Sequence, residues 1–198
     1  MIRALALALA ALLALLAGCR ALPAQPVAAP AAGERTAIAA LATWQAAGRV
    51  AVRAGNDGFN ASFDWSEDGG RGELGVRGPF GAGAVRIHRS DQQIVIESGG
   101  APPLAVAAPF DALEPELVAR LGFPLPLEPL RYWVRGVPAP GLPADGDGSD
   151  FRQDGWRVTV AEFVPVAGAP GALPARLTLS RDTTRIRVVV DRWHVGTP

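Results

Sequence analysis

Along much of this chain, apolar and polar residues alternate one by one, a pattern typical of β-strands that bury one face. In the clearest segment, 59–66, the odd-numbered positions are apolar and the even-numbered positions are polar. Turn sequences rich in Gly, Asn and Asp separate the alternating segments. The alternation predicts strands at 49–53, 59–66, 73–77, 84–89, 93–97, 156–163, 176–180 and 185–193.

A different spacing precedes the first of these strands. Segment 36–47 places Ile38, Leu41 and Trp44 three residues apart, and Gly48 follows as the expected stop. Apolar residues at this spacing share one face of an α-helix. We therefore expect one helix over 36–47.

The centre of the chain also has helical spacing. Segment 111–121 begins with Asp111 as the expected N-cap, and segment 127–135 follows a proline-rich connection. The next segment, 136–149, is polar and rich in Gly and Pro, and we expect a loop there. The order is a helix, five strands, a helical insert and at least three strands. It predicts a mainly β (α+β) fold, a single curved antiparallel sheet with helices against its concave face.

The N-terminus has the features of a targeting segment. Arg3 precedes an apolar run of about 13 residues, which is too short to span a bilayer. The run ends at Leu16-Ala17-Gly18-Cys19, which resembles the lipobox of bacterial lipoproteins, and Cys19 is the only cysteine. We expect residues 1–18 to be a lipoprotein signal peptide and Cys19 to be lipidated. An ordinary secretory signal followed by a chance cysteine is the alternative.

The rest of the chain suits one domain. Residues 19–35 are rich in Ala and Pro and predict an extended tether, and residues 36–198 predict the folded domain. The 19 basic and 19 acidic residues balance, so the chain has no electrostatic footprint for nucleic acid. No second apolar stretch approaches the ~20 residues of a membrane-spanning helix.

The sequence contains none of the common catalytic motifs. No zinc-binding His pair, nucleophile elbow or phosphate-binding loop is present. His88 and His194 each lie on the polar face of a predicted strand, and solvated surface residues are the favoured interpretation. We expect no enzyme activity, no cofactor and no metal site.

Two other features of the sequence point to a function. The first is a set of large apolar residues on the inward faces of the strands, which form either a filled core or the wall of an apolar cavity. These cavity candidates are Phe59, Phe63, Trp65, Leu74, Val76, Ile87, Ile96, Trp156, Val158, Leu177, Ile186 and Val188.

The second feature is Phe80, preceded by Pro79 in a glycine-rich turn between two predicted strands. An aromatic side chain flanked by Pro and Gly projects into solvent more readily than it folds back into the core. Exposed aromatic side chains mark partner or membrane contacts, so we expect Pro79 and Phe80 to form a membrane-contact loop. Packing of Phe80 on its own hairpin is the alternative.

Several short motifs of the chain together resemble a known protein family. In order and spacing, the chain is similar to the LolB family, the outer-membrane lipoprotein receptors of Gram-negative bacteria. The motifs that carry the resemblance are Gly48-Arg49, Phe63-x-Trp65, Gly78-Pro79-Phe80-Gly81, Gly122-Phe123-Pro124-Leu125-Pro126, Leu130-Arg131-Tyr132-Trp133-Val134-Arg135-Gly136-Val137-Pro138, Phe151-Arg152-Gln153-Asp154-Gly155-Trp156, Leu173-Pro174 and Trp193.

The resemblance implies an unclosed β-barrel with a helical lid over a hydrophobic cavity. It implies a monomeric, lipid-anchored protein on the periplasmic face of the outer membrane. This protein would accept acylated lipoproteins from a LolA-like periplasmic carrier and insert them into outer-membrane lipid. The family loop that matches Gly78–Gly83 typically carries Leu where this chain has Phe80. A lipocalin-like lipoprotein that binds a small apolar ligand without transferring it is the alternative, and a structural envelope lipoprotein with a filled core is another.

Overall fold

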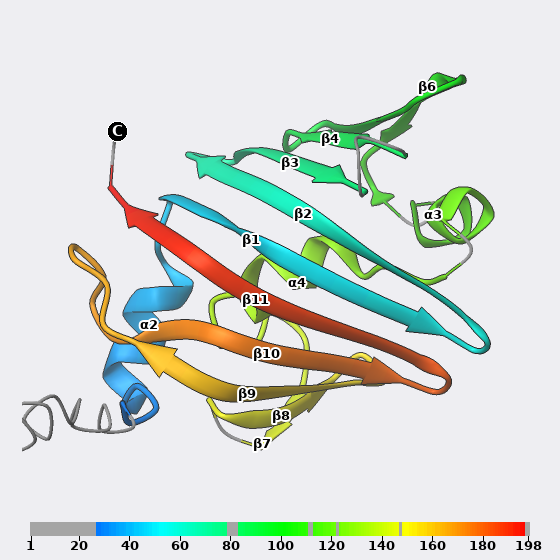
Figure 1. The fold of residues 1–198 in the computed structure, drawn as a ribbon. Helices are drawn as coiled ribbons and strands as arrows, with labels where there is room; N and C mark the ends of the chain where they lie inside the picture. Colours follow the sequence, from blue (N-terminus) through cyan, green and yellow to red (C-terminus); the bar gives the residue numbers. More distant parts are fainter. Residues whose placement is uncertain (1–26, 79–82, 111–112, 122, 147, 197–198) are drawn as a thin grey trace, which may run out of the picture.

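Among the residues that the computed structural model describes, eleven strands form one antiparallel sheet (Figure 1). The structure describes residues 27–78, 83–110, 113–121, 123–146 and 148–196. Across the sheet the strands run in the order β6-β5-β4-β3-β2-β1-β11-β10-β9-β8-β7. Their bounds are β1 Thr43–Ala54, β2 Asp57–Asp68, β3 Arg71–Arg77, β4 Val85–Arg89, β5 Gln93–Ser98, β6 Ala101–Ala107, β7 Ala144–Gly146, β8 Asp150–Gln153, β9 Trp156–Val164, β10 Leu173–Arg181 and β11 Thr184–Val195.

The sheet joins the two ends of the domain. Strand β1 pairs along its length with β2 on one side and with β11 on the other. The order ends at β6 on one edge and β7 on the other, so the curved sheet does not close within the described residues. The predicted fold class, a mainly β protein with a single open antiparallel sheet, is confirmed.

Three helices lie among the described residues: α2 Ala32–Ala39, α3 Leu113–Leu121 and α4 Leu127–Trp133. Helix α4 crosses the face of the sheet that carries the buried side chains, which we call the inner face (Figure 1). Helices α3 and α4 agree with the predicted insert; the expected cap Asp111 lies outside the described residues. None of the helices in the described part of the chain is long and apolar enough to span a bilayer.

The helix expected over 36–47 is wrong. Helix α2 begins at Ala32 and ends at Ala39, and strand β1 begins at Thr43. Trp44 and Ala46 are buried while Gln45 between them is exposed, which is strand alternation rather than a helical stripe. Pairing of β1 on both sides outweighs the three-residue spacing, which arose because a helix, a connection and a strand each contribute one apolar residue.

Helix α2 also reaches into the segment expected to be tether, since residues 32–35 form its first turn. The Glu34 carboxylate accepts a hydrogen bond of 2.7 Å from the backbone N–H of Ala31 and satisfies one free donor of the helix start. Ile38 is fully buried against Val137 and Leu173. The folded part of the chain therefore begins a few residues before the predicted boundary.

Gly48 is a strand residue and not a helix stop. The register between β1 and β11 shifts between Ala47 and Gly48, so that Asp191 is the extra residue of a β-bulge. A Cβ atom at position 48 would lie 2.0 Å from the backbone oxygen of Val189. Only glycine allows this approach of the two backbones.

Three strands escaped the sequence prediction. Strand β6 contains Pro102 and Pro103, and it is an edge strand, where proline is tolerated because one row of N–H groups needs no partner. Strands β7 and β8 are short and lie at the other edge. The expected loop at 136–149 therefore includes one strand, β7.

Candidate functional site

A cavity of about 600 Å³ lies between the inner face of the sheet and the helical segment 123–134. Its wall is almost wholly apolar, because Asn60 and Ser98 are the only polar side chains among the lining residues that the structure describes. These residues are Val50, Val52, Phe59, Asn60, Ala61, Phe63, Trp65, Leu74, Val76, Gly78, Gly83, Ala84, Val85, Ile87, Ser98, Gly99, Phe123, Leu125, Leu130, Val134, Ile186 and Val188.

The sheet side of the cavity is built in rows. Antiparallel register places Trp65, Leu74 and Ile87 directly beside one another on β2, β3 and β4. The neighbouring row, two residues along each strand, is Phe63, Val76 and Val85. Because strand side chains point to the same face every second residue, both rows face the cavity together.

The helical side is contributed by α4 and the connection that precedes it, which together we call the lid (residues 123–134). Leu130 and Val134 are four residues apart and so lie on one face of α4, toward the sheet. Phe123 and Leu125 extend the apolar wall along the connection. None of these four residues is among the predicted cavity residues, although the four-residue spacing of Leu130 and Val134 was a usable signal.

The mouth of the cavity lies where β2 begins. Phe59 is 42% exposed although it lines the cavity, and its ring lies 5.7 Å from that of Phe123 (centroid to centroid). Gly78 and Gly83, which flank the β3–β4 loop, line the cavity as well. The loop residues Pro79 and Phe80, like Cys19, lie outside the described residues.

The structure places eight of the twelve cavity candidates in the wall: Phe59, Phe63, Trp65, Leu74, Val76, Ile87, Ile186 and Val188. The other four, Ile96, Trp156, Val158 and Leu177, are buried in the core and do not line the cavity. Trp133 of α4 packs on Trp156 at 6.3 Å between ring centroids. Large side chains thus fill the interior over β9 and β10, and the free space lies over β1–β4 and β11.

The lid is held firmly at its C-terminal end. Arg135 donates hydrogen bonds to the backbone oxygens of Ile38 (2.6 Å) and Leu41 (3.1 Å). Burial lowers the pKa of Arg135 to about 10. Trp133 donates a hydrogen bond of 2.7 Å from Nε1 to Gln153 Oε1 on β8. These contacts fasten the end of α4 both to the α2–β1 connection and to the far edge of the sheet.

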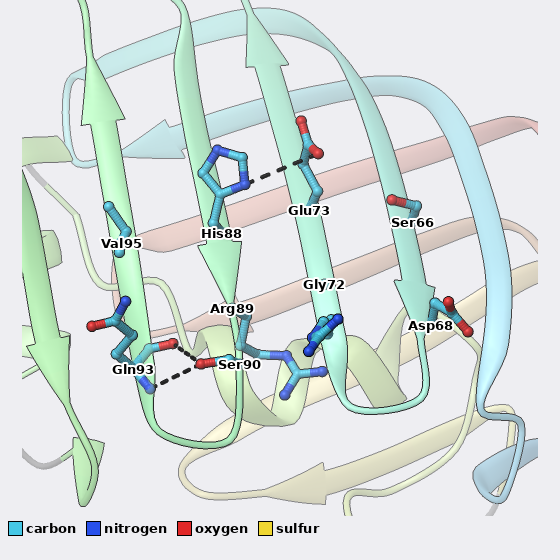
Figure 2. Close-up of a pocket in the computed structure, with 10 residues that line it drawn as sticks. Ser66, Asp68, Gly72, Glu73, His88, Arg89, Ser90, Gln93 and Val95 are labelled. Atoms are coloured by element: carbon cyan, nitrogen blue, oxygen red, sulfur yellow. Dashed lines mark hydrogen bonds and ion pairs between the residues drawn. The ribbon is translucent and has the colours of Figure 1, made fainter.

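A second depression, of about 350 Å³, lies on the outer face of the sheet over β2–β5 (Figure 2). Its side chains are mostly polar, and Figure 2 shows His88 beside Glu73, with 4.0 Å between Nδ1 and a carboxylate oxygen. His88 is half-exposed and His194 is exposed, so both lie at the surface as predicted. Among the described residues no group of three His, Cys, Asp or Glu side chains is placed to hold a metal ion.

An open sheet curved around a helical lid, with an apolar cavity between them, defines a class of proteins built to enclose a hydrophobic ligand. Comparison with known proteins makes the class specific. The family model described as outer membrane lipoprotein LolB matches residues 42–193. The chain therefore belongs to the LolB family, as its sequence motifs predicted. Its members are outer-membrane lipoproteins that act as receptors in lipoprotein localisation.

Individual relatives are similar in sequence to this chain over most of their length. The outer-membrane lipoprotein LolB of Halorhodospira halophila is 35% identical, covering 78% of this chain and 77% of the relative. That of Alkalilimnicola ehrlichii is 34% identical, covering 91% and 92%. That of Marinomonas sp. is 28% identical, covering 96% and 97%. These matches favour the receptor over the lipocalin-like alternative.

Among solved structures, a DUF1329 family protein from Desulfovibrio piger is similar in fold. Its TM-score is 0.51 at 6% identity, over 83% of this chain and 90% of that chain. This likeness supports the architecture alone.

Proposed function

We propose that this outer-membrane lipoprotein accepts acylated lipoproteins from a LolA-like periplasmic carrier, shelters their acyl chains in the cavity and inserts them into the outer membrane. The observation that carries the proposal is the cavity of about 600 Å³ whose described wall bears no charged side chain. A cavity of this kind is suited to hydrocarbon.

The energetics of the cargo explain why such a shelter is needed. Each buried CH₂ group contributes ~0.8 kcal/mol, so an acylated protein does not cross water unaided at a useful rate. Cargo moves only down a gradient of affinity, and the receptor therefore has to bind acyl chains more tightly than the carrier and less tightly than the bilayer.

In this proposal the residues before the domain act as anchor and tether. Residues 1–18 are removed, Cys19 carries the lipid, and the segment up to helix α2 links the lipid to the domain, which works as a monomer. The anchor only raises the concentration of the domain at its membrane. A non-lipidated Cys19→Ala form is therefore expected to bind cargo as the wild type does.

Release into the membrane is assigned to the loop that contains Pro79 and Phe80. Its flanking residues Gly78 and Gly83 line the cavity, so the loop joins the sheet at the mouth. A Phe side chain buried in lipid contributes ~2 kcal/mol, which is enough to bias the mouth of a tethered domain toward the bilayer.

The test is Phe80→Glu, measured by transfer of a lipoprotein from the carrier to liposomes. We expect the variant to bind cargo normally and to fail in delivery, because a carboxylate does not enter the bilayer. Phe80→Leu, which restores the residue typical of the family, is the matched control and should deliver cargo. Normal delivery by Phe80→Glu would refute the role of the loop.

A further inference from the structure

The apolar rows of the cavity wall stop at a charged row. Beyond Trp65, Leu74 and Ile87, the next positions on the same face of β2, β3 and β4 are Glu67, Gly72 and Arg89, which lie side by side in register. Glu67 and Arg89 are both more than 90% buried. A buried ion pair thus stands where the next layer of cavity wall would otherwise be.

Gly72 makes this pairing possible. Glu67 and Arg89 are on strands separated by β3, and their side chains meet over the glycine. A Cβ atom at position 72 would lie 2.5 Å from Glu67 Oε1. Glu67 Oε2 accepts a hydrogen bond from Arg89 Nη2, and Glu67 Oε1 accepts one of 3.0 Å from Trp65 Nε1. The last apolar row is therefore bonded directly to the charged row.

The lid adds a third charged group to this end of the cavity. Glu128, in the first turn of α4, has a buried carboxyl oxygen. Burial raises the pKa of Glu128, and the charges of Arg89, Arg131, Glu67 and Asp91 act on it as well. On the outer face, Gly72 and Arg89 border the polar depression of Figure 2. On the inner face, the apolar cavity therefore ends at a group of charged side chains.

We propose that the Glu67–Arg89 pair is the end stop of the cavity and sets the longest acyl chain that the protein can hold out of water. The inference rests on the proposed function, in which the cavity takes acyl chains. If the methyl end of an acyl chain advanced past Trp65, it would have to separate Glu67 from Arg89. Hydrocarbon cannot replace the hydrogen bonds that the two side chains would lose. Methylenes beyond the limit stay in water at the mouth and add no affinity.

The end stop gives the cavity a measurable depth. The inward run from Phe59 at the mouth to Trp65 spans six residues of β2, or about 20 Å. Saturated fatty acids from decanoate to eicosanoate, displacing an environment-sensitive fluorophore from the non-lipidated domain, test this depth. We expect affinity to rise about fourfold per added CH₂ and then to level off once the extended chain exceeds that length.

The chain length at which the affinity levels off is called the break. Two variants test what causes it. In the double variant Glu67→Met with Arg89→Met, apolar side chains of similar length replace the pair, a change that buried ion pairs often tolerate. We expect its break at longer chains. In Leu74→Trp, one row nearer the mouth, we expect the break at shorter chains. The matched control is Asp64→Asn with Arg77→Gln, which removes an exposed pair between β2 and β3 and should leave the break unchanged.

Three results would overturn the end stop. They are affinity that keeps rising with chain length in the wild type, a break that stays in place in the folded double variant, and a break that Leu74→Trp does not move. The wild-type series needs no substitution, so a double variant that fails to fold still leaves a decisive measurement. Absence of saturable binding at every chain length would instead contradict the proposed function.

Discussion

Arg135, which directly follows the lid, donates a hydrogen bond of 2.6 Å to the backbone oxygen of Ile38, 97 residues earlier in the chain. The guanidinium also lies over the rings of Trp44 and Tyr132, at 5.4 and 5.0 Å from their centroids. One side chain therefore joins α2, β1 and the end of α4. It fixes the C-terminal end of the lid, whereas at the mouth Phe123 packs against Phe59 of the sheet.

Substituting Arg135→Met should destabilise the domain by about 3 kcal/mol. The change removes the donor to the carbonyls of Ile38 and Leu41 and the cation over two aromatic rings. Urea denaturation monitored by tryptophan fluorescence measures the loss. Arg176→Gln, which breaks an exposed ion pair with Glu162, is the control and should leave the midpoint nearly unchanged. Equal effects of the two substitutions would contradict the role of Arg135.

Gln153 is the second tie between the lid and the sheet. It is 2% exposed and bonds Trp133, both backbone groups of Ala139 and the carbonyl of Leu142. Gln153→Leu leaves these buried groups without their hydrogen-bond partner. We expect the free energy of unfolding to fall by about 3 kcal/mol, or Tm to fall by about 10 °C. Gln45→Leu, at an exposed position of β1, should change Tm by far less.

Two glycines should respond to alanine in opposite directions. Gly48→Ala places a methyl group 2.0 Å from the Val189 oxygen at the β-bulge, and we expect a cost of about 3 kcal/mol or more. Gly33→Ala, in helix α2, meets no atom within 4 Å and should stabilise the domain by about 0.5 kcal/mol. Thermal unfolding of both variants gives the comparison, and a harmless Gly48→Ala would disprove the close approach of β1 and β11.

Glu128 should make stability depend on pH. Burial raises the pKa of this carboxyl group, and Glu67 and Asp91 raise it further, whereas Arg89 and Arg131 lower it. Between the ordinary carboxyl pKa and the raised one, the folded protein binds more protons than the unfolded chain. Stability from this group therefore falls as pH rises through that window. Urea midpoints across this range should decline more steeply for the wild type than for Glu128→Gln. Parallel profiles would show that Glu128 is not the cause.

Filling the cavity should weaken ligand binding without unfolding the domain. Ala61 lines the cavity between Phe59 and Phe63, and Ala61→Phe projects a ring into the free space. We expect at least about a tenfold loss of affinity for palmitate, since fewer CH₂ groups leave water. Ala51→Phe, on the other face of neighbouring β1, should bind as the wild type does. Unchanged affinity of Ala61→Phe would place the bound chain elsewhere.

The period-two alternation allowed eight strands and one curved antiparallel sheet to be predicted from the sequence. The reason is local: every second side chain of a strand meets the same environment, so the burial of a face is recorded in the order of residues. The error at 36–47 shows the limit of this signal. Ile38, Leu41 and Trp44 are all apolar, yet partners far along the chain decide which of them is helical.

The candidate site, too, was only partly predictable from the sequence. Alternation identified the inward residues correctly, including the four that proved to be core, because it reports which face is buried. It cannot report what stands opposite that face. Trp133 packs on Trp156 and fills the interior there, whereas Leu130 and Val134 line a cavity together with Phe63 and Val76.

By itself, then, the sequence determined eight of the eleven described strands, the inward faces and the family. Tertiary structure alone decided that part of the interior is empty, that Gly48 is a bulge residue, and that Glu67 and Arg89 meet over Gly72. These features depend on the register of the strands and on the position of α4 against the sheet. Both are set by the packing of residues distant in sequence, which no local pattern records.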